Sequence, residues 1–146
     1  MSIDQAANAR YGRIILGVYV GLNAVLLIGT SAVLWNFNAR AHSHGISPNG
    51  QLGFRTQHTL ASLRGWYVAQ RAGFHFAAAA ATVITVIVLA LIVIAVVRRL
   101  NPLWLLLIPV LGGVAVAVSL VLAGHRADHA AVSVETPSRS ASSHTM

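Results

Sequence analysis

The 146-residue chain contains no cysteine and no lysine, and only three of its residues are acidic. Without cysteine there can be no disulfide, thiolate metal site, iron–sulfur cluster or cysteine nucleophile. Three scattered carboxylates cannot assemble a paired-carboxylate acid–base site or an intramembrane proton relay. The sequence also lacks a Gly-rich phosphate loop followed by Lys and Ser or Thr, an HExxH motif and a GxSxG motif. These absences predict a protein that is not an enzyme and that carries no cofactor.

Apolar residues, by contrast, make up 56% of the chain, against 9% charged residues. A soluble domain of this length needs more polar surface than that. Three apolar runs, residues 14–35, 76–97 and 102–123, are each long enough to cross a hydrocarbon core of about 30 Å. We therefore predict an all-α integral membrane protein with three transmembrane helices.

The remaining segments are polar. They comprise an N-terminal segment (residues 1–13), a polar and amphipathic connection (36–75) and a C-terminal tail (124–146) that is rich in Ser and Thr. The composition of the tail predicts a flexible segment unless a partner orders it. A signal peptide is the competing interpretation of residues 14–35, because Ala39-Arg40-Ala41 resembles a cleavage site. The uncharged run is longer than the usual h-region of about 7–15 residues, which favours a retained span.

Small residues in the first and third spans predict close helix packing. Gly17 and Gly21 form a small-xxx-small pair, and Gly112 and Gly113 lie on a thin face of the third span. Asn23 is a lone amide near mid-membrane, and an unpaired amide in hydrocarbon costs about 1–3 kcal/mol, so it should face another helix. The alternative is a glycine spacing that arose by chance in an apolar helix.

Arginine supplies all ten basic residues, and the net charge is +7. These arginines flank the apolar runs, where anionic lipid head groups satisfy them, so we expect membrane lipids and no nucleic acid as partners. Under the three-span topology, the connection and the tail carry six arginines and the opposite side carries four. This count favours a cytoplasmic connection, whereas the Arg98-Arg99 pair in the short turn favours the reverse.

The second half of the connection has helical spacing. From residue 59 onward, apolar side chains recur at positions 60, 63, 67 and 74, and Thr59 is placed as the N-cap. We predict one amphipathic interfacial helix in the head-group layer, with Trp66 and Tyr67 as anchors. This interpretation does not account for the segment just before it, Gly53-Phe54-Arg55-Thr56.

That segment and its neighbours resemble the signature of the SdpI family, a group of small bacterial membrane proteins. The family pattern runs approximately P-N-x-x-x-G-x-R-T-P-W-T-L-S-S-x-x-x-W-x-x-x-H-R-x-G-G before a transmembrane helix, and it aligns here without a gap. Gln57, His58, Gln70 and Phe74 replace its proline, tryptophan, histidine and second glycine. With the following pair of spans, the resemblance extends over roughly residues 14–123. The matching residues, which are the candidate binding residues, are Pro48, Asn49, Gly53, Arg55, Thr56, Thr59, Leu60, Ser62, Trp66, Tyr67, Arg71 and Gly73.

The resemblance implies binding rather than catalysis. The namesake of the family is an immunity protein that protects a bacterium from its own secreted peptide toxin and tethers a transcriptional repressor at the membrane. It implies a multi-pass protein of the bacterial inner membrane with the motif on the cytoplasmic side. The alternative, which the small-residue faces and the exposed connection favour, is an accessory subunit of a larger actinobacterial membrane complex, such as a lipid transporter or respiratory assembly. Other membrane subunits or further copies of the chain are therefore expected partners.

All seven histidines fall on one side of the membrane under this topology. His75 opens the second span and His125 closes the third, and His129 lies one helical turn beyond His125. These three are candidates for a transition-metal or proton-responsive site. Because no cysteine or carboxylate cluster completes a coordination sphere, ordinary interfacial histidines are the simpler interpretation, and no metal is predicted.

Overall fold

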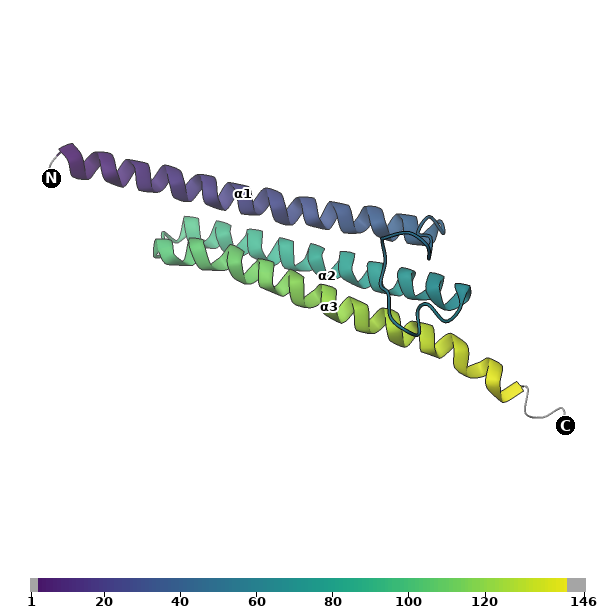
Figure 1. The fold of residues 1–146 in the computed structure, drawn as a ribbon. Helices are drawn as coiled ribbons and strands as arrows, with labels where there is room; N and C mark the ends of the chain where they lie inside the picture. The colour runs from purple at the N-terminus through teal and green to yellow at the C-terminus, as the bar shows by residue number, and fades with distance from the viewer. Residues whose placement is uncertain (1–2, 142–146) are drawn as a thin grey trace.

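The computed structural model describes the backbone of residues 3–141 and the side chains of residues 10–134. Within this range the chain consists of α1 (Ile3–His42), α2 (Leu63–Val97) and α3 (Pro102–Ala141). α2 and α3 form an antiparallel hairpin, and α1 runs alongside it (Figure 1). The start of α1 and the α2–α3 turn therefore lie at one end of the bundle. The connection between α1 and α2 lies at the other end.

All three helices are long and apolar enough to cross a membrane. Their outward faces carry large apolar side chains, such as Val25, Val86 and Leu111, which are more than 60% exposed. Exposure of such surface to water costs about 25 cal/mol per Å², and a helix satisfies its own backbone groups in lipid. The prediction of an all-α membrane protein with three spanning helices is confirmed.

The predicted interfacial helix does not exist as a separate element. Ser62, and not Thr59, is the N-cap of α2, and its side chain accepts a hydrogen bond from the backbone N–H of Gly65 at 3.0 Å. From Leu63 the helix continues without a break into the second span. The amphipathic segment is therefore the first three to four turns of α2.

The buried face of these first turns also differs from the predicted one. Trp66 and Gln70 are fully buried and Phe74 is 8% exposed, whereas Leu60 and Leu63 are more than half exposed. The prediction failed because it placed lipid against this segment. The structure places the α1–α2 loop and the end of α1 there instead. Ala41 and Ile46 pack with the tryptophan and the phenylalanine, and the glutamine is bonded to the loop backbone at Phe54.

α1 and α3 are longer than their apolar runs. α3 continues through Ala141, although the sequence predicted a flexible tail from residue 124. Ala127 and Ala131 of this extension pack against Ala69 of α2, and all three are fully buried. This small-residue contact gives the polar extension a packing partner that its composition does not reveal. Residues 142–146 of the predicted tail lie outside the described residues. At the other end, α1 begins at Ile3, within the predicted polar segment.

Small side chains also bring the three helices together in the middle of the bundle. Ala77, Ala78 and Ala81 of α2 are fully buried against Leu34 of α1 and Ala123 of α3. Such residues let helix backbones approach closely, which is the usual mode of packing in a bilayer.

Farther along the hairpin, one glycine of the predicted thin face lies at a close contact. A Cβ on Gly112 would stand 2.5 Å from Cγ2 of Val88, so α3 can approach α2 here only because the side chain is absent. The neighbouring Gly113 has nothing within 4 Å of the same position. The two adjacent glycines therefore have opposite environments.

Polar contacts attach the second half of α1 to α2. The hydroxyl oxygens of Ser31 and Thr85 lie 3.0 Å apart, and Nε1 of Trp35 donates to the Thr82 hydroxyl at 2.9 Å. Both contacts cross from one helix to the next within the apolar part of the bundle. The Ser31 and Thr82 hydroxyls also donate to carbonyls of their own helices, so their attachment to the neighbouring helix leaves no hydroxyl unpaired.

The first half of α1 is much less covered. Neither Gly17 nor Gly21, both in the described part of α1, has an atom within 4 Å of the position of a Cβ. Asn23 is half-buried, and its side-chain amide donates to the carbonyl of Tyr19 in its own helix at 2.8 Å. Only 6% of the most apolar stretch of α1 is buried, against 22% for each of the other helices. The predicted packing glycines of α1 therefore face away from α2 and α3.

Candidate functional site

The α1–α2 loop, residues 43–62, passes across α2 toward α3 before it returns to the start of α2 (Figure 1). Trp66 fixes its first part, because the fully buried indole donates from Nε1 to the carbonyl of Ile46 at 2.8 Å. Ile46 is itself buried beside Ala41 and Phe74. A buried tryptophan needs such a partner for its N–H. Trp66 thus anchors the loop inside the protein and is not the membrane-interface anchor that the sequence predicted.

Gln70 holds the middle of the loop. Its Oε1 accepts a hydrogen bond from the backbone N–H of Phe54 at 2.9 Å, and its Nε2 donates to the carbonyl of Phe54 at 3.0 Å. The fully buried amide thus satisfies both backbone groups of one residue, as a neighbouring strand would. Gln70 stands where the family pattern has histidine, so a departure from the pattern takes part in the attachment of the loop.

The Phe54 ring enters the space between α2 and α3. Its centroid lies 4.9 Å from that of Phe74, and a Cβ on Gly73 would stand 2.5 Å from its Cε2. The ring also contacts the small side chains of Ala127 and Ala131 on α3. The close approach of the Phe54 ring therefore requires glycine at position 73. Phe74, which stands where the family pattern has a second glycine, adds an aromatic contact with the same ring.

Gly53 is required both by its backbone conformation and by its surroundings. Its φ of 122° lies in a region that residues with a side chain rarely adopt. A Cβ here would stand 2.8 Å from Oε1 of Gln70 and 2.9 Å from Cη2 of Trp66. The glycine thus lets the loop backbone lie directly on the two buried side chains that hold it.

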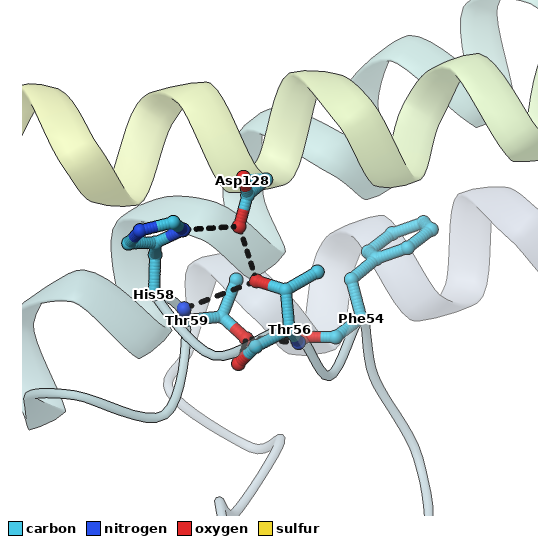
Figure 2. A network of polar contacts seen from close by, with 5 residues as sticks. All are labelled: Phe54, Thr56, His58, Thr59 and Asp128. Atoms are coloured by element: carbon cyan, nitrogen blue, oxygen red, sulfur yellow. Dashed lines mark hydrogen bonds and ion pairs between the residues drawn. The ribbon is translucent and has the colours of Figure 1, made fainter.

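Figure 2 shows how the loop is joined to α3 through Asp128. The Thr56 hydroxyl donates to Oδ1 of Asp128, and Nδ1 of His58 lies 3.2 Å from the same oxygen. Thr59 is fully buried; its hydroxyl donates to the carbonyl of Phe54 at 3.0 Å and accepts from the backbone N–H of Thr56 at 2.8 Å. Asp128 lies five residues beyond the third apolar run, so this contact joins the loop to the extension of α3.

Arg55 stabilises the turn at the start of the motif. One terminal nitrogen of its guanidinium, Nη2, donates to the carbonyls of Pro48, at 2.8 Å, and Gly50. The guanidinium carbon also lies 5.9 Å from the ring centroid of Trp66, within cation–π distance. The charge of Arg55 is therefore directed at the loop's own backbone.

Arg71 joins α2 to the end of α1. Its Nε donates to the carbonyl of Ala41 at 3.4 Å, and its Nη2 donates to the carbonyl of His42 at 3.2 Å and lies 2.9 Å from Nε2 of His44. A cation at these carbonyls is favoured by the helix dipole. The His44 ring packs edge-on against the Tyr67 ring, with centroids 4.7 Å apart. These contacts close the first turn of the loop.

The motif residues that remain accessible lie on the outside of the loop. Asn49 and Leu60 are exposed, and two leucines outside the motif, Leu52 and Leu63, are 48% and 65% exposed. We call these four residues the outer loop surface. Beneath it a groove of about 270 Å³ is lined by the loop and by the start of α2, with Pro48, Thr59, Leu60 and Trp66 among its lining residues.

The structure does not gather the three candidate histidines into one group of ligands. No group of three His, Cys, Asp or Glu side chains among the described residues is close enough to hold a metal ion. The His75 ring packs edge-on against Trp35, with centroids 6.2 Å apart. His75 and His129 line one groove between α2 and α3, and His125 is exposed beside it.

Three residues that hold the loop were not among the candidate binding residues predicted from the sequence: Phe54, Gln70 and Asp128. A signal for Gln70 is present, because it shares one helical face with Trp66, Gly73 and Ala77 at spacings of four, three and four residues. Asp128 carries no comparable signal, since its partner lies 72 residues earlier in the chain. The helix extension that presents it was predicted to be flexible.

The fold and the site define a small three-helix membrane protein with a motif-bearing loop fixed across one end of the bundle. A family model described as the SdpI/YfhL protein family matches residues 46–123, which is more than half of the chain. The match begins in the α1–α2 loop and includes α2 and the apolar part of α3. The chain belongs to the SdpI/YfhL family, as the sequence predicted. Neither the curated proteins nor the solved structures gave a match.

Proposed function

We propose that this protein acts by binding, as a non-enzymatic SdpI-like protein of the bacterial inner membrane in peptide-toxin immunity or signal relay. One observation carries the proposal: Arg55, Arg71 and Thr59 hold the loop, and the outer loop surface is left exposed. Each of these three side chains donates a hydrogen bond to a backbone carbonyl. A rigid surface of this kind suits recognition, because little ordering is required when a partner binds.

The chemistry of the outer loop surface favours an amphipathic peptide or protein segment. Leu52, Leu60 and Leu63 offer apolar contacts, and the exposed Arg64 stands next to them with a positive charge. With the loop on the cytoplasmic side, as the family resemblance implies, a membrane-active peptide would reach this surface after it has inserted into the bilayer. A protein bound there would be held at the membrane, which is what a signal relay needs.

The test is complementation of a strain that lacks the gene, exposed to secreted peptide toxins and followed by transcript profiling. The wild-type gene should restore resistance or a transcriptional response. Leu60→Asp with Leu63→Asp should fail to do so at a normal protein level, because both leucines are exposed and the fold does not depend on them. Leu100→Asp, a similarly exposed leucine at the opposite end, is the control. A strain whose resistance and transcription are both unchanged would contradict the proposal.

A second candidate is an accessory subunit of a larger membrane complex. The observation that favours it is the uncovered first half of α1, where Gly17 and Gly21 present a backbone surface to the outside. A partner helix could pack there closely. After mild solubilisation, a large complex should co-purify with the wild type and not with the Gly17→Leu/Gly21→Leu variant, whereas Val18→Leu should retain it. Migration as a single small protein or as a homo-oligomer would exclude this candidate.

A further inference from the structure

A groove on the outside of the α2–α3 hairpin is not used by either proposed function. It has a volume of about 710 Å³ and is open to the surroundings. Its position in the membrane follows from the apolar runs, since the second run begins at residue 76 and the third ends at residue 123. The groove therefore lies at the level of the lipid head groups, on the same side as the α1–α2 loop. Its lining residues are Ala72, His75, Phe76, Ala79, Arg126 and His129.

Arg126 gives this groove a positive charge. The guanidinium carbon of Arg126 lies 4.6 Å from the centroid of the Phe76 ring, a contact that holds the side chain over the groove. Asp128, the acidic residue nearest to Arg126 in the chain, instead contacts Thr56 and His58 of the loop. His75 and His129 add imidazole nitrogens to the same lining. An arginine held in this way presents several N–H donors to an anionic oxygen group such as phosphate.

The floor of the groove and the surface beyond it are apolar. Ala72 and Ala79 have small side chains that leave the space open. Along the same face of α2, Val83 and Val86 follow at helical spacing and are 58% and 61% exposed. A molecule with its anionic group at Arg126 would therefore extend its apolar part along these valines, toward the bilayer centre.

We propose that this groove is a binding site for an anionic phospholipid, with Arg126 as the main phosphate ligand and an acyl chain against Val83 and Val86. Charge complementarity selects the head group, because a basic pocket between helices at the membrane surface favours anionic over zwitterionic lipids. The apolar continuation selects a lipid over a free phosphate ion, which would leave the valine face without a contact. This site is independent of the outer loop surface.

The test is native mass spectrometry of the full-length protein titrated with phosphatidylglycerol and, separately, with phosphatidylcholine. The wild type should retain phosphatidylglycerol preferentially. Arg126→Gln should weaken this binding about fivefold, the equivalent of about 1 kcal/mol for one basic residue near an anionic lipid. Arg64→Gln, an exposed arginine outside the groove, should leave the binding unchanged.

Two further variants distinguish the effect of the positive charge at position 126 from the effect of the shape of the groove. Arg126→Lys should keep most of the preference, because the positive charge remains. Ala79→Leu should reduce binding without any change in charge, because the larger side chain fills the groove. Circular dichroism in detergent confirms that each variant is helical, and Ala79→Leu provides the decisive comparison if Arg126→Gln does not fold.

Three outcomes would overturn the proposal. The first is equal retention of the two lipids by the wild type. The second is an equal effect of Arg126→Gln and Arg64→Gln, which would indicate general attraction by surface charge. The third is displacement of phosphatidylglycerol by millimolar inorganic phosphate, which would identify a small-anion site in place of a lipid site.

Discussion

Replacement of Gln70 by leucine tests whether its amide holds the α1–α2 loop in place. Leucine keeps most of the side-chain volume and removes both polar atoms that pair with Phe54. The Phe54 N–H then loses its partner, whereas the Phe54 carbonyl keeps the Thr59 hydroxyl at 3.0 Å. An orphaned donor costs about 1–3 kcal/mol and the second lost hydrogen bond adds about 1 kcal/mol. Because the Phe54 backbone is only partly buried, we expect the loop to lose about 2–3 kcal/mol of attachment.

The loss of attachment can be measured as the hydrogen-exchange rate of the Phe54 amide, by NMR in detergent micelles. A loss of 2–3 kcal/mol in local opening free energy should accelerate exchange of the Phe54 amide by about 30- to 150-fold. Amides in the middle of α2 should be unaffected, because the opening is confined to the loop. Protease cleavage within residues 43–62 should accelerate in parallel.

Gln57→Leu is the matched control, since the same change is made at an exposed glutamine of the same loop. It should leave the exchange rate of the Phe54 amide within about threefold of the wild type, which corresponds to less than about 0.7 kcal/mol. The reasoning is refuted if Gln70→Leu also stays within threefold while its helices remain intact. It is equally refuted if both variants accelerate exchange alike.

Three further predictions concern backbone approach and helix ends, each measured as the unfolding free energy in mixed detergent and SDS. Gly53→Ala should destabilise the protein by about 1–3 kcal/mol, because the new methyl group would meet two buried side chains at an unfavourable φ. Gly112→Ala should cost about 1–3 kcal/mol by overpacking the hairpin, whereas the adjacent Gly113→Ala should be within about 0.5 kcal/mol of the wild type; equal effects would contradict the assigned faces. Arg71→Gln should lower stability by about 1–2 kcal/mol through the lost contacts with the end of α1, and Arg64→Gln, which is exposed, should have little effect.

The number of spans and the family were predictable because both depend on local information. Each apolar run is a continuous stretch of sequence, and the spacing of the motif from Pro48 to Gly73 is intact. Both features can be read without knowledge of which residues meet in space. The three spanning helices and the family match follow from them.

The placement of the motif was not predictable in the same way, because it depends on contacts between distant segments. Trp66 was expected at the membrane surface, since an exposed segment and one covered by a neighbouring helix can share the same spacing. In the structure Ala41 of α1 and Ile46 of the loop pack on Trp66, and Ala127 and Ala131 of the α3 extension pack on the neighbouring Ala69. Alanines in a polar stretch give no sign that another helix packs on them. The bond between Thr56 and Asp128 depends on the same extension.

The arrangement of the loop separates two groups of positions with different tolerance to change. One group, including Gly53, Gln70 and Thr59, faces inward and holds the backbone of the loop. The other, the outer loop surface, can be replaced in chemistry and in charge without loss of those bonds. The chemistry of the outward positions can therefore vary while the bonds that hold the loop backbone to the three helices stay the same.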